Sequence, residues 1–150
     1  MDALYSNQIL ALAANMPRVG RLAEPDGTAK AVSKVCGSEV EVDLRLDGTV
    51  ISDLAVRPKA CALGQAATAV LAANAVGASL AELEAARDGL AAMLKEGAPP
   101  PQGRFADLAA LAPVKDYPRR WASVQLAFRA ALDAAASVTT AAGLHASQRS

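Results

Sequence analysis

The chain contains only two cysteines, and each lies in a setting that suits thiol chemistry. Cys36 precedes Gly37 between two predicted strands, where glycine permits a sharp turn and a close approach of the backbone to a ligand. Cys61 lies where the last predicted strand gives way to a helix, so the free N–H groups of the helix start favour its thiolate. Arg57 and Lys59 are close in sequence and act in the same direction. Together these features predict a metal, cluster or sulfur-handling site.

Each cysteine alone has a simpler interpretation. Cys61 could be a small buried apolar residue at a strand–helix junction, and Cys36 an incidental thiol in a turn. The two together are more informative. Cys36 follows the first predicted strand and Cys61 follows the third, and in an antiparallel meander those two strand ends lie at the same end of the sheet.

Other side chains give weaker indications of chemistry. The single histidine, His145, lies near the end of the chain, which argues against a Cys–His dyad. Glu39, Glu41 and Asp43 alternate with apolar residues and are interpreted as the solvated face of a strand. No general acid–base pair and no phosphate-binding glycine pattern is found, so ordinary catalysis is not predicted.

The composition limits the class of protein. A chain of 150 residues is expected to form one domain, and its 53% hydrophobic and 3% aromatic content means that alanine, leucine and valine fill the core. The net charge of zero argues against nucleic-acid binding. The sequence contains no run of 18 uncharged apolar residues, so no membrane span is predicted. The first residues do not form an export signal, so we expect a cytoplasmic protein with reduced thiols.

Hydrophobic periodicity predicts an α+β fold with an N-terminal helix that ends at Pro17 and three antiparallel strands at residues 29–35, 39–46 and 49–56. The sequence Asp47-Gly48 predicts a hairpin between the second and third strands. We expect the third strand to turn Val50, Leu54 and Val56 toward the core. Pro58, which has no N–H group, is expected to end the pairing.

About four helices are predicted to cover one face of this sheet. They run from Cys61 to a stop at Gly77, from the capping box at Ser79 to near Gly97, over residues 105–111, and from Pro118 to about Ala136. Trp121 and Phe128 share one face of the last helix and are expected in the core. We predict a single domain over residues 1–136 and a flexible tail over 137–150.

Many of these residues fall in an order and spacing that resemble a known family, the iron–sulfur cluster assembly scaffolds of the NifU-like, IscU/SufU type. The resemblance runs from Tyr5 to about Leu132. It rests on Tyr5-x3-Ile9-Leu10, Pro17, Gly20, Pro25-Asp26-Gly27-x-Ala29, Cys36-Gly37, Leu46-Asp47-Gly48-x2-Ile51-x-Asp53, Ala60-Cys61-Ala62, Pro113-Val114 and Arg120-x5-Leu126-Ala127-Phe128-x2-Ala131-Leu132. The fold that the resemblance implies agrees with the predicted elements.

The resemblance also implies a ligand set. Such scaffolds hold a nascent [2Fe–2S] cluster, iron or zinc with three cysteines, an aspartate and sometimes a histidine. Cys36 and Cys61 match the first two cysteines. Ser38 stands at the aspartate position, Ser123 at the third cysteine, and Ala122 where some members have histidine. Two ligand positions are therefore matched and two are replaced by serine, and a serine hydroxyl is a poor metal ligand near neutral pH because its proton has a very high pKa.

Clusters and structural zinc ordinarily take four ligands, so one protomer should hold them weakly. Three hypotheses remain. Two protomers could each supply Cys36 and Cys61 to one bridging cluster in a homodimer. Cys61 could instead accept a persulfide from a cysteine desulfurase and pass it to a recipient protein. Alternatively, the chain is a degenerate interaction or regulatory module without metal. In each case we expect a scaffold, carrier or interaction module rather than an enzyme, with sulfur transfer left open.

Overall fold

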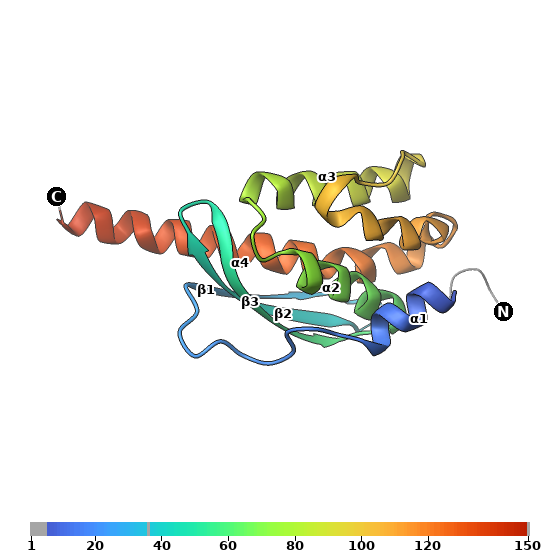
Figure 1. Ribbon diagram of the computed structural model, residues 1–150, viewed down its shortest axis with the longest axis horizontal. Coiled ribbons are helices and arrows are strands. Elements are labelled where there is room, and N and C mark those ends of the chain that lie inside the picture. Colours follow the sequence, from blue (N-terminus) through green and yellow to red (C-terminus); the bar gives the residue numbers. More distant parts are fainter. Residues whose placement is uncertain (1–5, 36, 150) are drawn as a thin grey trace.

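The computed structural model describes residues 6–35 and 37–149, with side chains described to Val138, and it confirms the predicted α+β fold (Figure 1). The elements in order are α1 (Asn7–Ala14), β1 (Gly27–Val32), β2 (Glu39–Asp47), β3 (Val50–Lys59), α2 (Ala62–Asn74), α3 (Leu80–Glu96), the 3₁₀ helices η2 (Gly103–Asp116) and η3 (Pro118–Arg120), and α4 (Trp121–Arg149). Helices α2, α3 and α4 lie on one side of the sheet, and the loop between α1 and β1 lies on the other.

The three strands form an antiparallel sheet in the order β1-β2-β3, as the hairpin pattern predicts. Val40, Val42 and Leu44 of β2 are fully buried under the helices. Helix α4 packs across β1 and β2, and α2 packs on β3 and α4. The alternation of β2 therefore places its apolar face in the core, where burial of each such side chain contributes about 1.5–3 kcal/mol.

The core face of β3 differs from the prediction near its start. Val50 is 38% exposed, whereas Ile51 is fully buried. The pairing shifts between Arg45 and Leu46, because Leu46 pairs with Ile51 but Arg45 pairs with Asp53. A bulge with one extra residue reverses the faces on either side of it. Leu54 and Val56 face the core, as predicted.

The expectation that Pro58 ends the pairing was wrong. Pro58 pairs with Val40, and β3 continues to Lys59. The N–H of Val56 points away from β2, because it donates to the carbonyl of Arg18 at 2.9 Å. Two residues further along, the nitrogen of Pro58 points the same way, so its missing N–H costs no bond with β2.

Strand β1 begins and ends earlier than predicted, at Gly27 and Val32. The chain turns next, and the N–H of Ser33 donates to the carbonyl of Ser38 at 2.8 Å. This bond closes the connection to β2, so residues 33–35, which were predicted to extend the strand, belong to the turn. The turn brings Ser38 back to the end of the sheet.

The helix signals were more accurate. Ser79 forms the predicted capping box with Glu82, and Gly97 ends α3 in the left-handed conformation at φ 68°. Phe128 is fully buried, with its ring centroid 5.5 Å from that of Phe105 in an edge-to-face contact. Trp121 packs against the core and donates its indole N–H to the carbonyl of Val114.

Two predicted boundaries near the C-terminus differ in extent. The helix predicted at 105–111 is a longer 3₁₀ segment, η2, which contains Pro113. Helix α4 continues to Arg149, past the predicted end near residue 136, and projects beyond the sheet in Figure 1. Flexibility of residues 137–150 stays a prediction. Within the described part of the chain, no helix has the length and apolar character needed to cross a membrane.

Candidate functional site

Cys61 is the N-cap residue of α2. Its backbone is extended, at φ −65° and ψ 171°, and an alanine-rich sequence carries the helix on from Ala62. The thiol forms no disulfide and is half-buried, so it packs against neighbouring residues and is still accessible to solvent. Position at a helix start gives the sulfur the environment that the sequence predicted, since unpaired N–H groups point toward it.

Ser123 in the first turn of α4 lies against this thiol. The Cys61 Sγ and Ser123 Oγ atoms are 3.4 Å apart, and Ser123 is only 1% exposed. Gly64 in the first turn of α2 makes this approach possible, because a Cβ there would lie 2.7 Å from Ser123 Oγ. The close crossing of α2 and α4 therefore depends on a missing side chain.

Ser38 completes the cluster from the turn before β2. Its Oγ lies 3.4 Å from Ser123 Oγ, and its side chain is buried. We call Ser38, Cys61 and Ser123 the Cys61 cluster. Three segments far apart in the sequence thus converge, which brings together one matched ligand position and both serine-replaced positions. Cys36 lies outside the described residues, so its place as a ligand stays a prediction.

The surroundings of Cys61 lower the pKa of its thiol. Partial burial acts in the opposite direction and raises it, but the Ser123 hydroxyl, the backbone N–H groups of Gly64 and Leu63, and the charge of Arg120 outweigh burial. The sulfur makes no regular capping hydrogen bond. The helix start therefore adds to the effect of Ser123 through the amides of Gly64 and Leu63.

Arg120 is a residue that sequence reasoning passed over as a functional group. It lies three residues before Ser123, and this spacing places two side chains on neighbouring positions of a helix surface. The spacing was the available signal. Gly64 carried no comparable signal, because its role depends on where α4 crosses α2.

Arg57 was expected to favour the Cys61 thiolate, and the structure corrects this. Its guanidinium contacts Asp43 at 2.8 Å and Glu41 at 2.9 Å on the opposite face of the sheet. It also donates to the carbonyl of Gly20 at 2.7 Å. Arg57 therefore fastens the loop before β1 to the sheet, and the cation that acts on Cys61 is Arg120.

The interpretation of Asp43 as part of a solvated face was also wrong, because its side chain is buried. It accepts hydrogen bonds from Arg57, the N–H of Leu22 and the hydroxyl of Thr28. Burial alone would raise the pKa of Asp43, but these donors outweigh burial and lower it. For Glu41, the hydrogen bond from Arg57 is the main cause of a lowered pKa.

A metal centre requires several ligand side chains close together. Among the described residues, no group of three or more His, Cys, Asp or Glu side chains could hold a metal ion. The Cys61 cluster offers one thiol and two hydroxyls. The side chain of His145 lies outside the described part. One chain therefore offers the Cys61 thiolate, with Cys36 as the expected second, which is half of the usual set.

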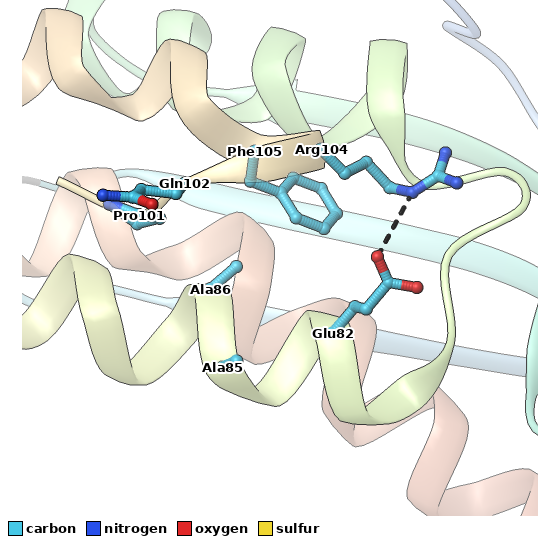
Figure 2. Close-up of a pocket in the computed structure, with 7 residues that line it drawn as sticks. All are labelled: Glu82, Ala85, Ala86, Pro101, Gln102, Arg104 and Phe105. Carbon is cyan, nitrogen blue, oxygen red and sulfur yellow. Dashed lines mark ion pairs between the residues drawn. The ribbon is translucent and has the colours of Figure 1, made fainter.

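A surface pocket of about 170 Å³ lies elsewhere, between α3 and the segment leading into η2 (Figure 2). Arg104 spans its edge, 3.6 Å from Glu82, and donates to the carbonyl of Asn74 at the far end of α2. A helix of this length separates that end from Cys61 by roughly 20 Å. Arg104 therefore joins α2 to α3, and the pocket is distinct from the Cys61 cluster.

The fold and the site together define an α+β domain with a free, half-buried thiol at the end of its sheet. The NifU-like N terminal domain family matches residues 4–124, so the chain belongs to that family of iron–sulfur cluster assembly scaffolds of the SufU and IscU type. This confirms the resemblance found in the sequence. Members of the family are typically non-catalytic and normally bind iron–sulfur clusters.

Solved structures agree with this assignment. The N-terminal NifU-like protein from Brucella abortus is 48% identical over 93% of this chain and 96% of its own, with a TM-score of 0.91. A putative iron–sulfur cluster assembly scaffold for the SUF system from Fervidobacterium islandicum is 22% identical, covers 85% of this chain and 93% of its own, and has a TM-score of 0.78. The latter shows the shared fold. No curated protein matches the chain.

Proposed function

We propose that this chain carries iron–sulfur cargo, with the Cys61 thiolate as its attachment point and Cys36 as the second thiolate. The observation that supports this best is the convergence of α2, α4 and the turn before β2 on a half-buried, free Cys61. Membership of a scaffold family gives the chemical class of the cargo, iron or a [2Fe–2S] cluster.

The count of donors suggests that two protomers share the cargo. Ser38 and Ser123 hold their protons near neutral pH, and their hydroxyl oxygens lie within hydrogen-bonding distance of each other. They therefore do not supply the missing ligands. Two copies of Cys36 and Cys61 supply four thiolates, which is the number that a [2Fe–2S] cluster ordinarily takes.

Anaerobic reconstitution with ferrous iron and sulfide tests this proposal. The wild-type chain is expected to gain the visible absorbance of a [2Fe–2S] cluster, with equal iron and acid-labile sulfide. Cys61→Ser and Cys36→Ser should each lose most of it. As a control, Ser52→Ala changes an exposed residue of β3 far from the Cys61 cluster, and this variant should load iron and sulfide like wild type. Equal loading of Cys61→Ser and wild type would contradict the proposal.

A second function, sulfur relay, is favoured by the composition of the Cys61 cluster. This cluster contains a single described thiol, with the Ser123 hydroxyl 3.4 Å from its sulfur. One thiol suffices for this role. The Cys61 thiolate would attack the outer sulfur of a donor cysteine persulfide, the donor thiolate would leave, and Cys61 would carry the persulfide. No oxidant is needed, because the sulfane sulfur moves unchanged in oxidation state. The partners are then a cysteine desulfurase and a recipient protein.

Incubation with a cysteine desulfurase and cysteine, followed by intact mass spectrometry, tests the relay. Cys36→Ser should gain the mass of one sulfur atom that reductant removes, and Cys61→Ser should not gain it at Cys36. If Cys36→Ser stays unmodified while the desulfurase turns over, Cys61 is not a persulfide acceptor.

A further inference from the structure

The charges of the chain balance overall but are unevenly paired. Fifteen basic and fifteen acidic residues give a net charge of zero. Most basic side chains of the sheet and of α3 form ion pairs, such as Arg57 with Asp43 and Arg87 with Asp88. Within the described part of the chain, four cations that form no ion pair lie toward the Cys61 end of the fold: Lys34, Arg119, Arg120 and Arg129.

The positions of these residues in the fold lie near the Cys61 cluster. Arg120 acts on the Cys61 thiol through its charge, and Arg119 precedes it in η3. Lys34 lies in the turn that Ser33 and Ser38 close. Arg129 of α4 donates to the carbonyl of Val32, at the entry to the same turn, at 3.1 Å. The four cations therefore come from three segments that each also contribute to, or lie next to, the Cys61 cluster: η3, α4 and the turn before β2. We call these four residues the cationic rim.

Few acidic groups oppose the rim. Glu39 forms ion pairs with Lys30 at 3.1 Å and with Lys59 at 3.9 Å. Asp116 shares a surface hollow with Arg119 and Arg120, and Asp133 follows Arg129 by one helical turn. The four rim cations outnumber these two carboxylates, whereas the chain as a whole is neutral.

The rim also carries apolar surface. Val35 in the turn is 73% exposed and Tyr117 beside η3 is 39% exposed. Exposed cations with an apolar and an aromatic side chain among them are suited to a protein partner rather than to a small ion, because interface contacts combine a charged rim with such anchors.

We propose that the cationic rim is the docking surface for an acidic segment of a partner protein that presents a cysteine sulfur to Cys61. The inference rests on the proposed function and adds the chemistry of the partner. Charge complementarity of this kind chiefly raises the association rate, by about 10-fold to 1,000-fold, and salt reduces the effect.

Disulfide exchange with charged peptides tests the docking surface directly. Three peptides carry one central cysteine, activated as a mixed disulfide with 2-thiopyridine and flanked by glutamate, glutamine or lysine. The Cys61 thiolate attacks the peptide sulfur, the bond to the pyridine sulfur breaks, and released pyridine-2-thione reports the rate. The Cys36→Ser variant is used, so that the released pyridine-2-thione reports the reaction of Cys61 alone. The glutamate peptide should react about tenfold faster than the glutamine peptide at low salt, and the lysine peptide slowest.

The ratio of the glutamate-peptide rate to the glutamine-peptide rate should fall toward one near 1 M salt, where the screening length is about 3 Å. Lys34→Glu with Arg119→Glu should reduce the ratio of glutamate to glutamine rates at low salt. Arg45→Glu with Arg87→Glu makes the same change in net charge far from Cys61 and should keep the ratio. Equal rates for the three peptides at low salt, or an equal loss of the ratio in both double variants, would overturn the proposal.

This result is separable from the proposed function. Iron and sulfide loading needs no partner segment, so a chain that loads cargo but shows no peptide preference contradicts the docking surface alone. A chain that prefers the glutamate peptide but never loads cargo or a persulfide contradicts the proposed function alone.

Discussion

At the scale of single residues, Ser123 is the side chain that most directly lowers the pKa of the Cys61 thiol. It is buried in α4, and its hydroxyl is 3.4 Å from the Cys61 sulfur. In a buried setting a hydroxyl that donates to a thiolate favours the charged form, while burial itself opposes it. A serine here therefore favours the thiolate form of Cys61 even though it is a poor metal ligand.

Ser123→Ala should raise the pKa of the Cys61 thiol, because burial then acts with one fewer opposing donor. At neutral pH the thiolate fraction falls, so alkylation by iodoacetamide should slow several-fold in a Cys36→Ser background. The pH–rate profile should move to higher pH. Arg120→Lys keeps the charge and should shift the profile much less than Ser123→Ala. An unchanged pH–rate profile in Ser123→Ala would show that the Ser123 hydroxyl does not lower the pKa of the Cys61 thiol.

The two cysteines and the two serines could be singled out from the sequence, because residue type and spacing carried both the chemistry and the resemblance. Their surroundings could not. Arg57 was assigned to the wrong site because sequence proximity to Cys61 does not tell which face of β3 a side chain occupies. It lies instead between Asp43 and Glu41.

At the scale of elements, the crossing of α2 and α4 holds the Cys61 cluster together. Glycine inside a helix costs about 1 kcal/mol relative to alanine. Gly64 nonetheless occupies the first turn of α2, where a Cβ would lie 2.7 Å from Ser123 Oγ and 2.8 Å from the Cβ of Ala60. Close packing at the site therefore outweighs helix propensity.

Gly64→Ala is expected to destabilise the fold by about 1–3 kcal/mol, because the added methyl group overpacks the α2–α4 crossing. Gly89→Ala in α3 is the matched control, since its nearest neighbour is Pro101 at 3.1 Å in a linker that can shift. The control should be near neutral. Urea denaturation measures both variants. Stabilisation of Gly64→Ala by its higher helix propensity would contradict the tight crossing.

The loop before β1 is held to the sheet by a second device, the buried pair of Asp43 and Arg57. Because the pKa of Asp43 is lowered in the folded state, its ionised form stabilises the fold above the unfolded pKa of about 3.9. That contribution is lost as pH falls through the folded pKa.

Asp43→Asn should therefore cost about 1–3 kcal/mol at pH 7, since it removes one charged partner of Arg57 while Glu41 and the Gly20 carbonyl remain. The stability of wild type should decline as pH falls below about 4, and that of Asp43→Asn should decline less steeply. Chemical denaturation from pH 7 to pH 3 measures the difference. Parallel pH curves would show that Asp43 does not contribute in this way.

Element types were predictable because periodicity and caps are local. Ser79 and Gly97 bound α3 as expected. The errors occurred where tertiary pairing decides: the bulge that places Ile51 rather than Val50 in the core, and the edge position that lets Pro58 remain in β3. Both depend on how β3 pairs with its neighbours, which residue types alone do not show.

At the scale of the whole molecule, the fold supplies one end of a sheet where a thiol, two hydroxyls and a cationic rim meet. One chain has only two cysteines, which is half the number of thiolates that a [2Fe–2S] cluster ordinarily takes. We therefore propose that cargo is held through Cys61 and shared by two chains.

Native mass spectrometry of the anaerobically reconstituted protein tests this claim most directly, because it counts chains, iron and sulfide in one particle. The account predicts a dimer that carries one [2Fe–2S] cluster, with cluster-bearing dimers absent in Cys61→Ser. A wild-type monomer that carries a complete cluster, or a Cys61→Ser dimer that loads as well as wild type, would contradict it.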